Sequence, residues 1–124
     1  MITHLSLGVS DMARATRFYD VALQPLGFAR VMEHDGAAGY GPPERPQFWL
    51  NAVSAPIAET PGTHVAFLAP SRLAVDEFYA AALAAGGADS GGPGLRPHYH
   101  PHYYAAFVID LDGHCIEAVC HQRP

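Results

Sequence analysis

The sequence has little of what marks a nucleic-acid-binding or a membrane protein. Only seven of its 124 residues are basic, they form no run, and the formal net charge is −5. A chain without a basic patch has no electrostatic footprint for a phosphate backbone, so we expect no nucleic-acid partner. No apolar run approaches the roughly 18 residues that a membrane span needs. The start also lacks the basic and apolar regions of a signal peptide. We therefore expect a soluble, cytoplasmic protein without a membrane partner.

Cysteine is also scarce, with only two residues, Cys115 and Cys120. They lie five positions apart in one predicted strand, so their side chains point to opposite faces and no intrachain disulfide is expected. Apolar residues make up 49% of the chain and charged residues 15%, which is a globular composition. The length favours a single domain over residues 1–124.

The chain contains an internal repeat at an offset of sixty residues. THLSLGVSDM (3–12) and THVAFLAPSR (63–72) begin with the same Thr-His pair, and the alignment needs no gap up to residue 27. Seven residues of the first segment recur sixty positions later, namely Thr3, His4, Phe18, Tyr19, Ala22, Leu23 and Gly27. Chance would give about 2 matches in such a window. We interpret the repeat as a duplication, with module 1 at residues 1–57 and module 2 at residues 58–124.

Each module is predicted to begin with a strand followed by a helix. Apolar residues alternate in 5–9 and in 65–69, which is the pattern of a strand with one covered face. Asp11 and Ser71 are typical N-cap residues, and the segments after them repeat apolar residues at helical spacing. Gly27 and the glycine pair at 86–87 are typical of helix C-termini.

Three short strands are predicted after each helix. They cover 28–34, 37–41 and 46–53 in module 1, and 88–95, 103–111 and 114–120 in module 2, with a turn at Asp112-Gly113. Residues 56–62 are the expected linker, and 91–101, rich in Gly, Pro and His, is expected to be a long loop. The predicted fold is therefore α+β, with the order βαβββ written twice.

Four polar residues take corresponding places in the two modules. His4 and His64 open the first strand of each module, and aligning FWLNAV (48–53) with HCIEAV (114–119) places Asn51 opposite Glu117. Strand alternation puts all four on the face away from the core. Two imidazoles and a carboxylate suit a divalent first-row metal and leave positions open for water or substrate. We predict His4, His64 and Glu117 as metal ligands.

The chain resembles the vicinal oxygen chelate superfamily, which includes glyoxalase I, fosfomycin-resistance proteins, bleomycin-resistance proteins and extradiol ring-cleaving dioxygenases. HLSLGVSDMARATRFYDVALQPLGF is similar to the family's opening strand and helix. YYAAFVIDLDGHCIEAV is similar to its closing hairpin, although Leu111 stands where the family commonly has proline. The resemblance implies two βαβββ modules in a curled mixed sheet around a metal-binding cavity, with the ligands at His4, His64 and Glu117. It also implies a homodimer.

Asn51 departs from the pattern of glyoxalase I. Those enzymes usually carry there a Glu that binds the metal and moves a proton, and an amide cannot act as a general base. The remaining three-ligand set resembles that of the dioxygenases and the fosfomycin-resistance enzymes. A site for a phosphonate substrate needs several cationic side chains, and the second half of the chain offers only Arg72, Arg96 and Arg123. This argues against an enzyme of the fosfomycin-resistance type.

We therefore expect a metal-dependent enzyme with a small-molecule substrate, and we favour a dioxygenase with Fe(II) over Zn, Ni or Mn. The alternatives are a glyoxalase-like lyase or isomerase, and a metal-free ligand-binding protein that sequesters an antibiotic. Whether the metal site forms within one chain or across a dimer is open.

Several further residues are candidates for the substrate site. Only one of Tyr103 and Tyr104 can face it, and we predict Tyr104 as the donor to a bound oxygen. Trp49 is a candidate aromatic wall or a core residue, and it shares a strand face with Asn51. Arg96 is a candidate partner for an anionic group.

His100 lies in the alternating run of His98, His100 and His102, which predicts either a polar lid or a solvated loop. We include His100, Arg96, Trp49 and Asn51 among the substrate-binding candidates.

Overall fold

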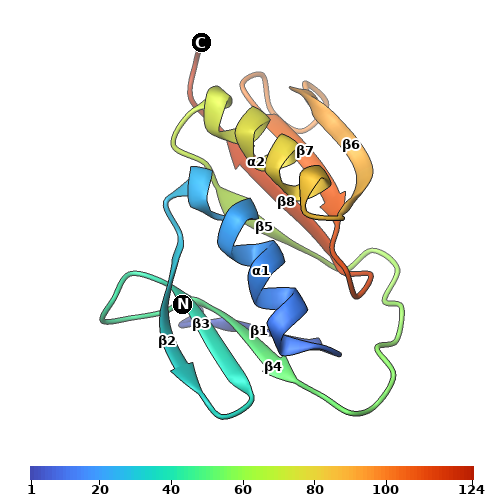
Figure 1. Ribbon diagram of the computed structural model, residues 1–124. Helices are drawn as coiled ribbons and strands as arrows, with labels where there is room; N and C mark the ends of the chain where they lie inside the picture. The colour runs from blue at the N-terminus through green and yellow to red at the C-terminus, as the bar shows by residue number, and fades with distance from the viewer.

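The computed structural model describes residues 1–124 and contains two modules, each with one helix and one four-stranded sheet (Figure 1). Module 1 consists of β1 (Leu5–Val9), α1 (Met12–Ala22), the 3-10 helix η1 (Gln24–Leu26), β2 (Ala29–His34), β3 (Ala37–Gly41) and β4 (Phe48–Ala52). Module 2 consists of β5 (His64–Leu68), α2 (Arg72–Ala84), β6 (Ala88–Leu95), β7 (Tyr104–Ile109) and β8 (Cys115–Cys120). The predicted α+β class and the doubled βαβββ order are confirmed.

The two sheets have the same topology. Their strand orders are β1-β4-β3-β2 and β5-β8-β7-β6, so in each module the first strand lies at one edge beside the last. That pair is parallel in both sheets, while the other neighbours are antiparallel. The sheets are curled but not closed, and α1 and α2 lie next to each other on one side of the molecule (Figure 1). Neither helix is long and apolar enough to cross a membrane.

Both helices begin at the predicted caps. The Asp11 side chain accepts a hydrogen bond from the Arg14 backbone N–H at 3.1 Å, and the Ser71 hydroxyl accepts one from the Ala74 N–H at 3.0 Å. Each side chain satisfies a backbone donor that the first helical turn leaves free. Gly27 ends the segment after α1 with a left-handed φ of 83°, where a side chain would be strained.

One hydrophobic core joins the two modules. The residues of β1, β4, β5 and β8 that point toward the helices belong to a single cluster of 22 buried residues. Phe18, Tyr19 and Phe78 lie within it, as expected of the repeated helical positions. Across the modules, the rings of Phe48 and Phe67 meet edge to face with their centroids 5.0 Å apart. Each buried ring of this kind contributes roughly 1.5–3 kcal/mol to stability, so this contact helps to hold the two modules together.

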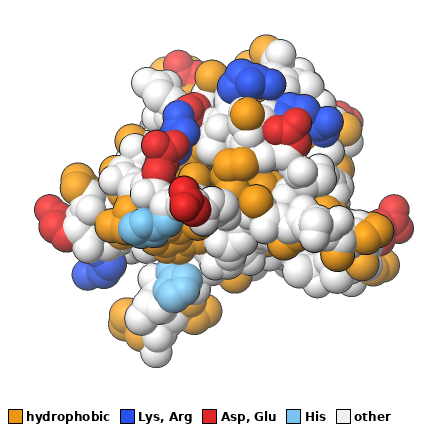
Figure 2. Space-filling view, turned by 60° about the horizontal axis from the view of Figure 1, so that its bottom comes forward, with side chains coloured by type: hydrophobic (Ala, Val, Ile, Leu, Met, Phe, Trp, Pro, Cys, Tyr) orange, Lys and Arg blue, Asp and Glu red, His pale blue; other side chains and the backbone are white.

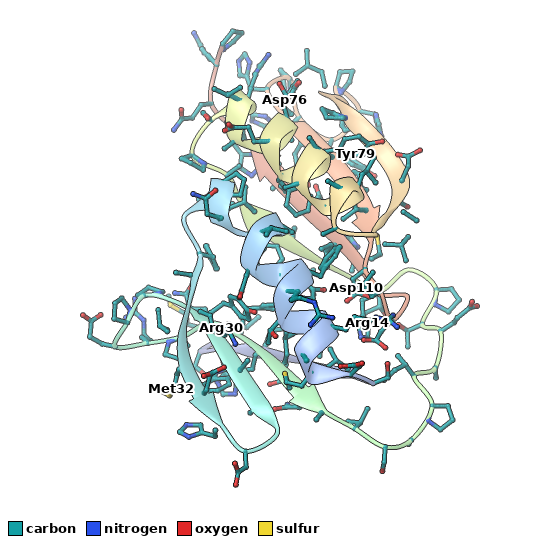
Figure 3. The ribbon with its side chains drawn as sticks, viewed as in Figure 1. Arg14, Arg30, Met32, Asp76, Tyr79 and Asp110 are labelled. Carbon is teal, nitrogen blue, oxygen red and sulfur yellow. The ribbon has the colours of Figure 1, made fainter.

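The turn between β7 and β8 is fastened to module 1 by polar contacts. Residues 110–114 are hydrogen-bonded to β1, to α1 and to Ser10 between them, through Ser10 Oγ to Asp112 Oδ1 (2.5 Å), Arg14 Nη2 to Leu111 O (3.1 Å) and His114 Nε2 with Gly8 O (2.7 Å). The buried Tyr19 hydroxyl also donates to Asp110 Oδ2 at 2.5 Å. Figure 3 shows Arg14 and Asp110 at this junction. These contacts fix how the two modules sit against each other.

Both cysteines are free thiols. Cys120 is fully buried in the core, whereas Cys115 is half-buried and lies on the other face of β8.

Candidate metal and substrate site

The face of the second sheet that α2 does not cover carries the ionisable residues. His64 lies at the start of β5. Glu117 of β8 pairs with Ala66, which is also in β5. On its other side Glu117 pairs with Phe107 of β7. Alternation along the strands therefore brings His64, Glu117 and Phe107 to one surface, which we call the open face of module 2.

Glu117 is a buried carboxylate with a different partner for each oxygen. Oε1 lies 3.2 Å from His64 Nε2, and Oε2 accepts a hydrogen bond from the Tyr103 hydroxyl at 2.5 Å. The carboxylate is only 1% exposed, while the His64 ring is 46% exposed. The pair thus combines a half-exposed imidazole with a buried carboxylate. Because a buried charge needs a partner, such an arrangement can hold a ligand or an ion at a protein surface.

Tyr103, and not the predicted Tyr104, contacts Glu117. The Tyr104 hydroxyl donates to Asp76 Oδ1 of α2 at 2.6 Å, on the helix-covered side of the sheet. Figure 3 shows Asp76 on that helix. Burial, together with the hydrogen bond to Glu117, raises the pKa of Tyr103 to about 12. The hydrogen bond to Asp76 raises the pKa of Tyr104 as well. Both hydroxyls therefore act as donors near neutral pH, each on its own face.

Two further residues of the open face were not singled out from the sequence. The Phe107 ring lies against the His64 ring with centroids 6.1 Å apart. Cys115 is paired with His64 across β8 and β5, and burial and then the charge of Glu117 raise the pKa of its thiol. Cys115 therefore carries a neutral thiol rather than a reactive thiolate. Alternation along β8, in which Cys115 lies two residues before Glu117, is the signal that would have identified Cys115, whereas Phe107 faces the site only in the strand register that the structure shows.

Arg96 reaches the same face from the loop that follows β6. Its guanidinium lies over the Phe107 ring, 5.5 Å from the centroid. It donates from Nη1 to Gly94 O at 2.8 Å and from Nη2 to Gly92 O at 2.9 Å. These bonds use two of the five N–H donors of the side chain, so donors remain for an anionic group.

His100 does not join the His64–Glu117 pair. Its Nδ1 accepts a hydrogen bond from the His102 N–H at 3.1 Å, and its ring lies 5.9 Å from the ring of His121. His100 thus belongs to the body of the loop rather than to the pair.

His4 lies apart from the other two predicted ligands. It is exposed just before β1, and its ring nitrogen shares a hydrogen bond with the Thr3 hydroxyl at 3.0 Å. Within one chain, no three His, Cys, Asp or Glu side chains come close enough to hold a metal ion. The structure therefore brings together two of the three predicted ligands, His64 and Glu117.

Trp49, rather than Asn51, takes the place in module 1 that corresponds to Glu117. Glu117 pairs with Ala66, and Ser6, sixty positions before Ala66, pairs with Trp49. Asn51 lies two residues further along β4, and it is exposed. The predicted equivalence of Asn51 and Glu117 is therefore wrong by two residues, because the alignment of FWLNAV with HCIEAV is two residues out of step with the strand pairing that the modules share. An indole can neither bind a metal nor act as a base.

The indole of Trp49 forms a flat surface on the face of the first sheet that points away from the core, which we call the open face of module 1. It stacks on the His34 ring at an interplanar angle of 11° and a centroid distance of 5.9 Å. It also lies directly over Gly39 of β3, where an added Cβ would come within 2.9 Å of the indole. Trp49 therefore packs on the open face and not in the core.

A cavity of about 380 Å³ borders His64. It is lined by residues 59–63 before β5, by Leu7 of β1, and by His114 and Cys115 where β8 begins. Its volume suits a small organic ligand. Elsewhere on the surface, acidic and arginine side chains lie interspersed, with hydrophobic side chains exposed between them (Figure 2).

The fold and the repeated sites define the class of protein. The fold consists of two βαβββ modules with curled mixed sheets of the same topology. The model of the Glyoxalase/Bleomycin resistance protein/Dioxygenase superfamily matches residues 1–118, and the chain belongs to this superfamily.

Solved structures share the whole architecture. A glyoxalase/bleomycin resistance protein from Albidiferax ferrireducens is 30% identical, with a TM-score of 0.86 over 100% of this chain and 99% of that one. A glyoxalase/bleomycin resistance protein/dioxygenase family enzyme from Burkholderia phytofirmans is 20% identical, with a TM-score of 0.71 over 97% and 98% of the two chains. A glyoxalase I variant from Zea mays is 20% identical, with a TM-score of 0.72 over 95% of this chain and 46% of that one. The last two show likeness of fold alone. No curated protein matches the chain.

The geometry of the His64–Glu117 pair is compatible with two of the three predicted ligands of a metal ion. Two ligand atoms bound to one ion at roughly 2.0–2.2 Å lie about 3 Å apart when their bonds meet near a right angle. The observed distance of 3.2 Å between His64 Nε2 and Glu117 Oε1 agrees with this. The donor set of imidazole nitrogen and carboxylate oxygen suits iron, zinc, nickel or manganese.

Proposed function

We propose that this protein is a divalent-metal-dependent enzyme that acts on a small molecule with two neighbouring oxygen atoms. The observation that carries this proposal is the distance of 3.2 Å between His64 Nε2 and Glu117 Oε1 on the open face of module 2. A buried carboxylate beside a half-exposed imidazole is costly unless a cation or a proton compensates the charge. A divalent ion bound by both groups compensates it.

The third ligand is His4 of a second copy of the chain. His4 is exposed and is not grouped with His64 and Glu117 of its own chain. The open face of module 2 also exposes Leu68 of β5 to 66%, and burial of this side chain by another chain would stabilise a dimer. A homodimer with two-fold symmetry would place the open face of module 1 of each copy against the open face of module 2 of the other, giving two equivalent sites.

Iron(II) is the ion that we favour. Two histidines and one carboxylate on one side of the ion, with the remaining positions open, are the typical ligand set of non-haem Fe(II) oxygenases. When bound, the ion would act as a Lewis acid toward the two neighbouring oxygens of the substrate. We place a dioxygenase first for this reason, and a lyase or isomerase with zinc, nickel or manganese second.

The residues around the pair would orient the substrate. The cavity beside His64 offers the space, and Phe107 forms an apolar wall next to the imidazole. Arg96, held over Phe107 by its bonds to Gly92 and Gly94, has N–H groups left for an anionic substituent of the substrate. Trp49 of the second copy would supply a flat apolar surface, which suits a planar substrate.

A metal-free binding protein is the competing function. The observation in its favour is that a single chain groups only two metal-binding side chains, His64 and Glu117, while the cavity beside His64 is already formed. In that case His64 would only line a polar groove, and ligand binding would be insensitive to chelators and to Glu117→Gln.

Metal content decides between these functions. The wild-type protein and the Glu117→Gln variant are purified anaerobically without a tag and without added metal, and both are analysed by elemental mass spectrometry. About one iron per chain in the wild type, lost in the variant, supports the proposal and leads to oxygen-uptake assays with catechols. About one zinc, nickel or manganese per chain favours lyase or isomerase chemistry. A wild-type protein that stays metal-free even after reconstitution supports the binding protein instead.

A further inference from the structure

The loop between β6 and β7 is a compact structure and not an open lid. The Arg96 N–H donates to Tyr103 O at 2.7 Å and closes its neck. Within the loop, the Tyr99 N–H donates to Arg96 O at 2.9 Å and the Tyr103 N–H donates to His100 O at 3.1 Å. The loop expected at 91–101 therefore begins only after Leu95, the last residue of β6, and hydrogen bonds of its own backbone tie it together and fix the backbone of Tyr103 at its end.

The ring of Tyr103 is held on two sides. The Tyr99 ring meets it edge-on with centroids 5.1 Å apart, and the His121 ring does so from the end of β8 at 5.2 Å. With its backbone fixed by the loop and its ring packed between two others, Tyr103 has little rotational freedom. Its hydroxyl points at Glu117 Oε2, 2.5 Å away.

This hydrogen bond distinguishes the two oxygens of Glu117. Oε2 is taken by Tyr103, so only Oε1 is turned toward His64. Without Tyr103, the second oxygen of a carboxylate that is 1% exposed would lack a donor. The carboxylate would then gain by rotating its oxygens toward His64 or toward water.

We propose that Tyr103 is a positioning residue that holds Glu117 so that the carboxylate offers a single oxygen to the metal ion. In this proposal the loop 96–103 keeps the side chain of Tyr103 in place. This inference rests on the proposed function, in which His64 and Glu117 bind a divalent ion. Groups that hydrogen-bond a metal ligand typically change metal affinity about 10- to 100-fold when they are removed, because they fix the orientation of the ligand. The histidine-rich loop thus serves the site through Tyr103, without a histidine of its own at the metal.

The chain offers a matched control in the next residue. Tyr103→Phe and Tyr104→Phe remove the same atom from neighbouring positions, each of which donates to a carboxylate. Tyr104 contacts Asp76 on the helix-covered side, so its loss should leave the metal site unchanged. Tyr99→Leu is a third variant. It removes the aromatic ring that packs against Tyr103 but keeps the Tyr103 hydroxyl, and Tyr99 itself is exposed.

The experiment is a titration of the metal-free full-length protein with Co²⁺. Calorimetry and the visible absorption of the bound ion are the two readouts. We expect Tyr103→Phe to weaken Co²⁺ binding by about 10- to 100-fold and to change the absorption spectrum of the bound ion, at unchanged stoichiometry. Tyr104→Phe should bind within about twofold of the wild type. Tyr99→Leu should lie between Tyr104→Phe and Tyr103→Phe, and its fold is safeguarded by the exposure of Tyr99.

The outcomes separate this inference from the proposed function. Equal Co²⁺ affinities and spectra for Tyr103→Phe and Tyr104→Phe would overturn the role of Tyr103 and leave the metal site intact. If Tyr103→Phe does not fold, a wild-type Co²⁺ affinity and spectrum for Tyr99→Leu would overturn the role of the loop 96–103 in fixing Tyr103. A wild-type protein that binds Co²⁺ no better than His64→Ala would overturn both the metal site and the role of Tyr103.

Discussion

Trp49 of β4 and Glu117 of β8 occupy the same position in the two modules. Trp49 pairs with Ser6 in the first sheet, and Glu117 pairs with Ala66, sixty residues on, in the second. The duplication has therefore placed an indole at one of two related positions and a carboxylate at the other. At this position one module carries a flat aromatic surface and the other a buried carboxylate, so the two halves of the protein differ in their chemistry.

The indole surface depends on Gly39. An added Cβ at this position would lie 2.9 Å from the Trp49 ring, so we expect Gly39→Ala to push the indole away from β3 and from His34. Trp49 is the only tryptophan of the chain, so the shift should appear as a change in the emission maximum of intrinsic fluorescence. Crowding at a well-packed position also costs about 1–3 kcal/mol.

Gly36→Ala is the control for this experiment. Gly36 lies in the turn before β3 with a φ of 73°, and an added Cβ would meet only Ala52, at 3.9 Å. This variant should be less stable because of backbone strain, yet keep the wild-type emission. An unchanged emission in Gly39→Ala would show that the indole does not rest on β3.

The fold follows from patterns that are local in the sequence. The offset of sixty residues, the alternation in the strands and the two N-caps at Asp11 and Ser71 were enough to predict the order βαβββ twice. The arrangement of the modules was not predictable in this way. It depends on contacts such as that between Phe48 and Phe67, which join segments far apart in the chain and leave no periodic signal.

The site was predicted in part, and one turn explains the error at Tyr104. A two-residue turn at Asp112-Gly113 would pair Leu111 with His114 and put Tyr104 on the Glu117 face. In the structure Asp110 pairs with His114, because the Asp110 carboxylate accepts hydrogen bonds from the N–H groups of Asp112 and His114. The turn is one residue longer, and a slip of one residue exchanges the faces of a strand. Tyr103 lies beside Glu117 for this reason.

The hydrogen bond between Tyr19 and Asp110 should carry a large share of the stability of the module junction. Both groups are buried and the acceptor is a carboxylate, so Tyr19→Phe should cost about 1.5–3 kcal/mol of unfolding free energy, measured by urea denaturation. Tyr79 is the repeat equivalent, and its hydroxyl donates to Asp89 in an exposed setting. Tyr79→Phe should therefore cost less than about 1 kcal/mol. Equal costs for the two variants would contradict a special role for the junction.

Stability should fall at alkaline pH. Burial, and then the nearby Asp110, raises the pKa of Tyr19 well above its ordinary value of about 10, and burial and Asp20 do the same for Tyr40. A group whose pKa is higher in the folded state binds its proton more tightly there. Its contribution is complete below about pH 10 and is lost as the pH rises above that value.

We expect the unfolding free energy to decrease above about pH 10 by roughly 1.4 kcal/mol per pH unit for each of these tyrosines. Urea denaturation between about pH 8 and pH 11 measures the slope. Tyr40→Phe should make it less steep by the contribution of one group. A free energy of unfolding that stays constant up to about pH 11 would show that these hydroxyls are not held protonated by the fold.

Mixing two defective variants tests whether the metal site is shared between chains. If His4 of one copy completes the His64–Glu117 pair of the other, neither His4→Ala nor Glu117→Gln alone should bind a full complement of metal. After subunit exchange, half of the dimers carry one chain of each kind, and each of these has one intact site out of two. Metal binding should then recover to about a quarter of the wild-type capacity, measured by Co²⁺ titration. Native mass spectrometry confirms that mixed dimers have formed. Mixed dimers that recover no binding would place all three ligands in one chain, and full metal binding by His4→Ala alone would remove His4 from the site.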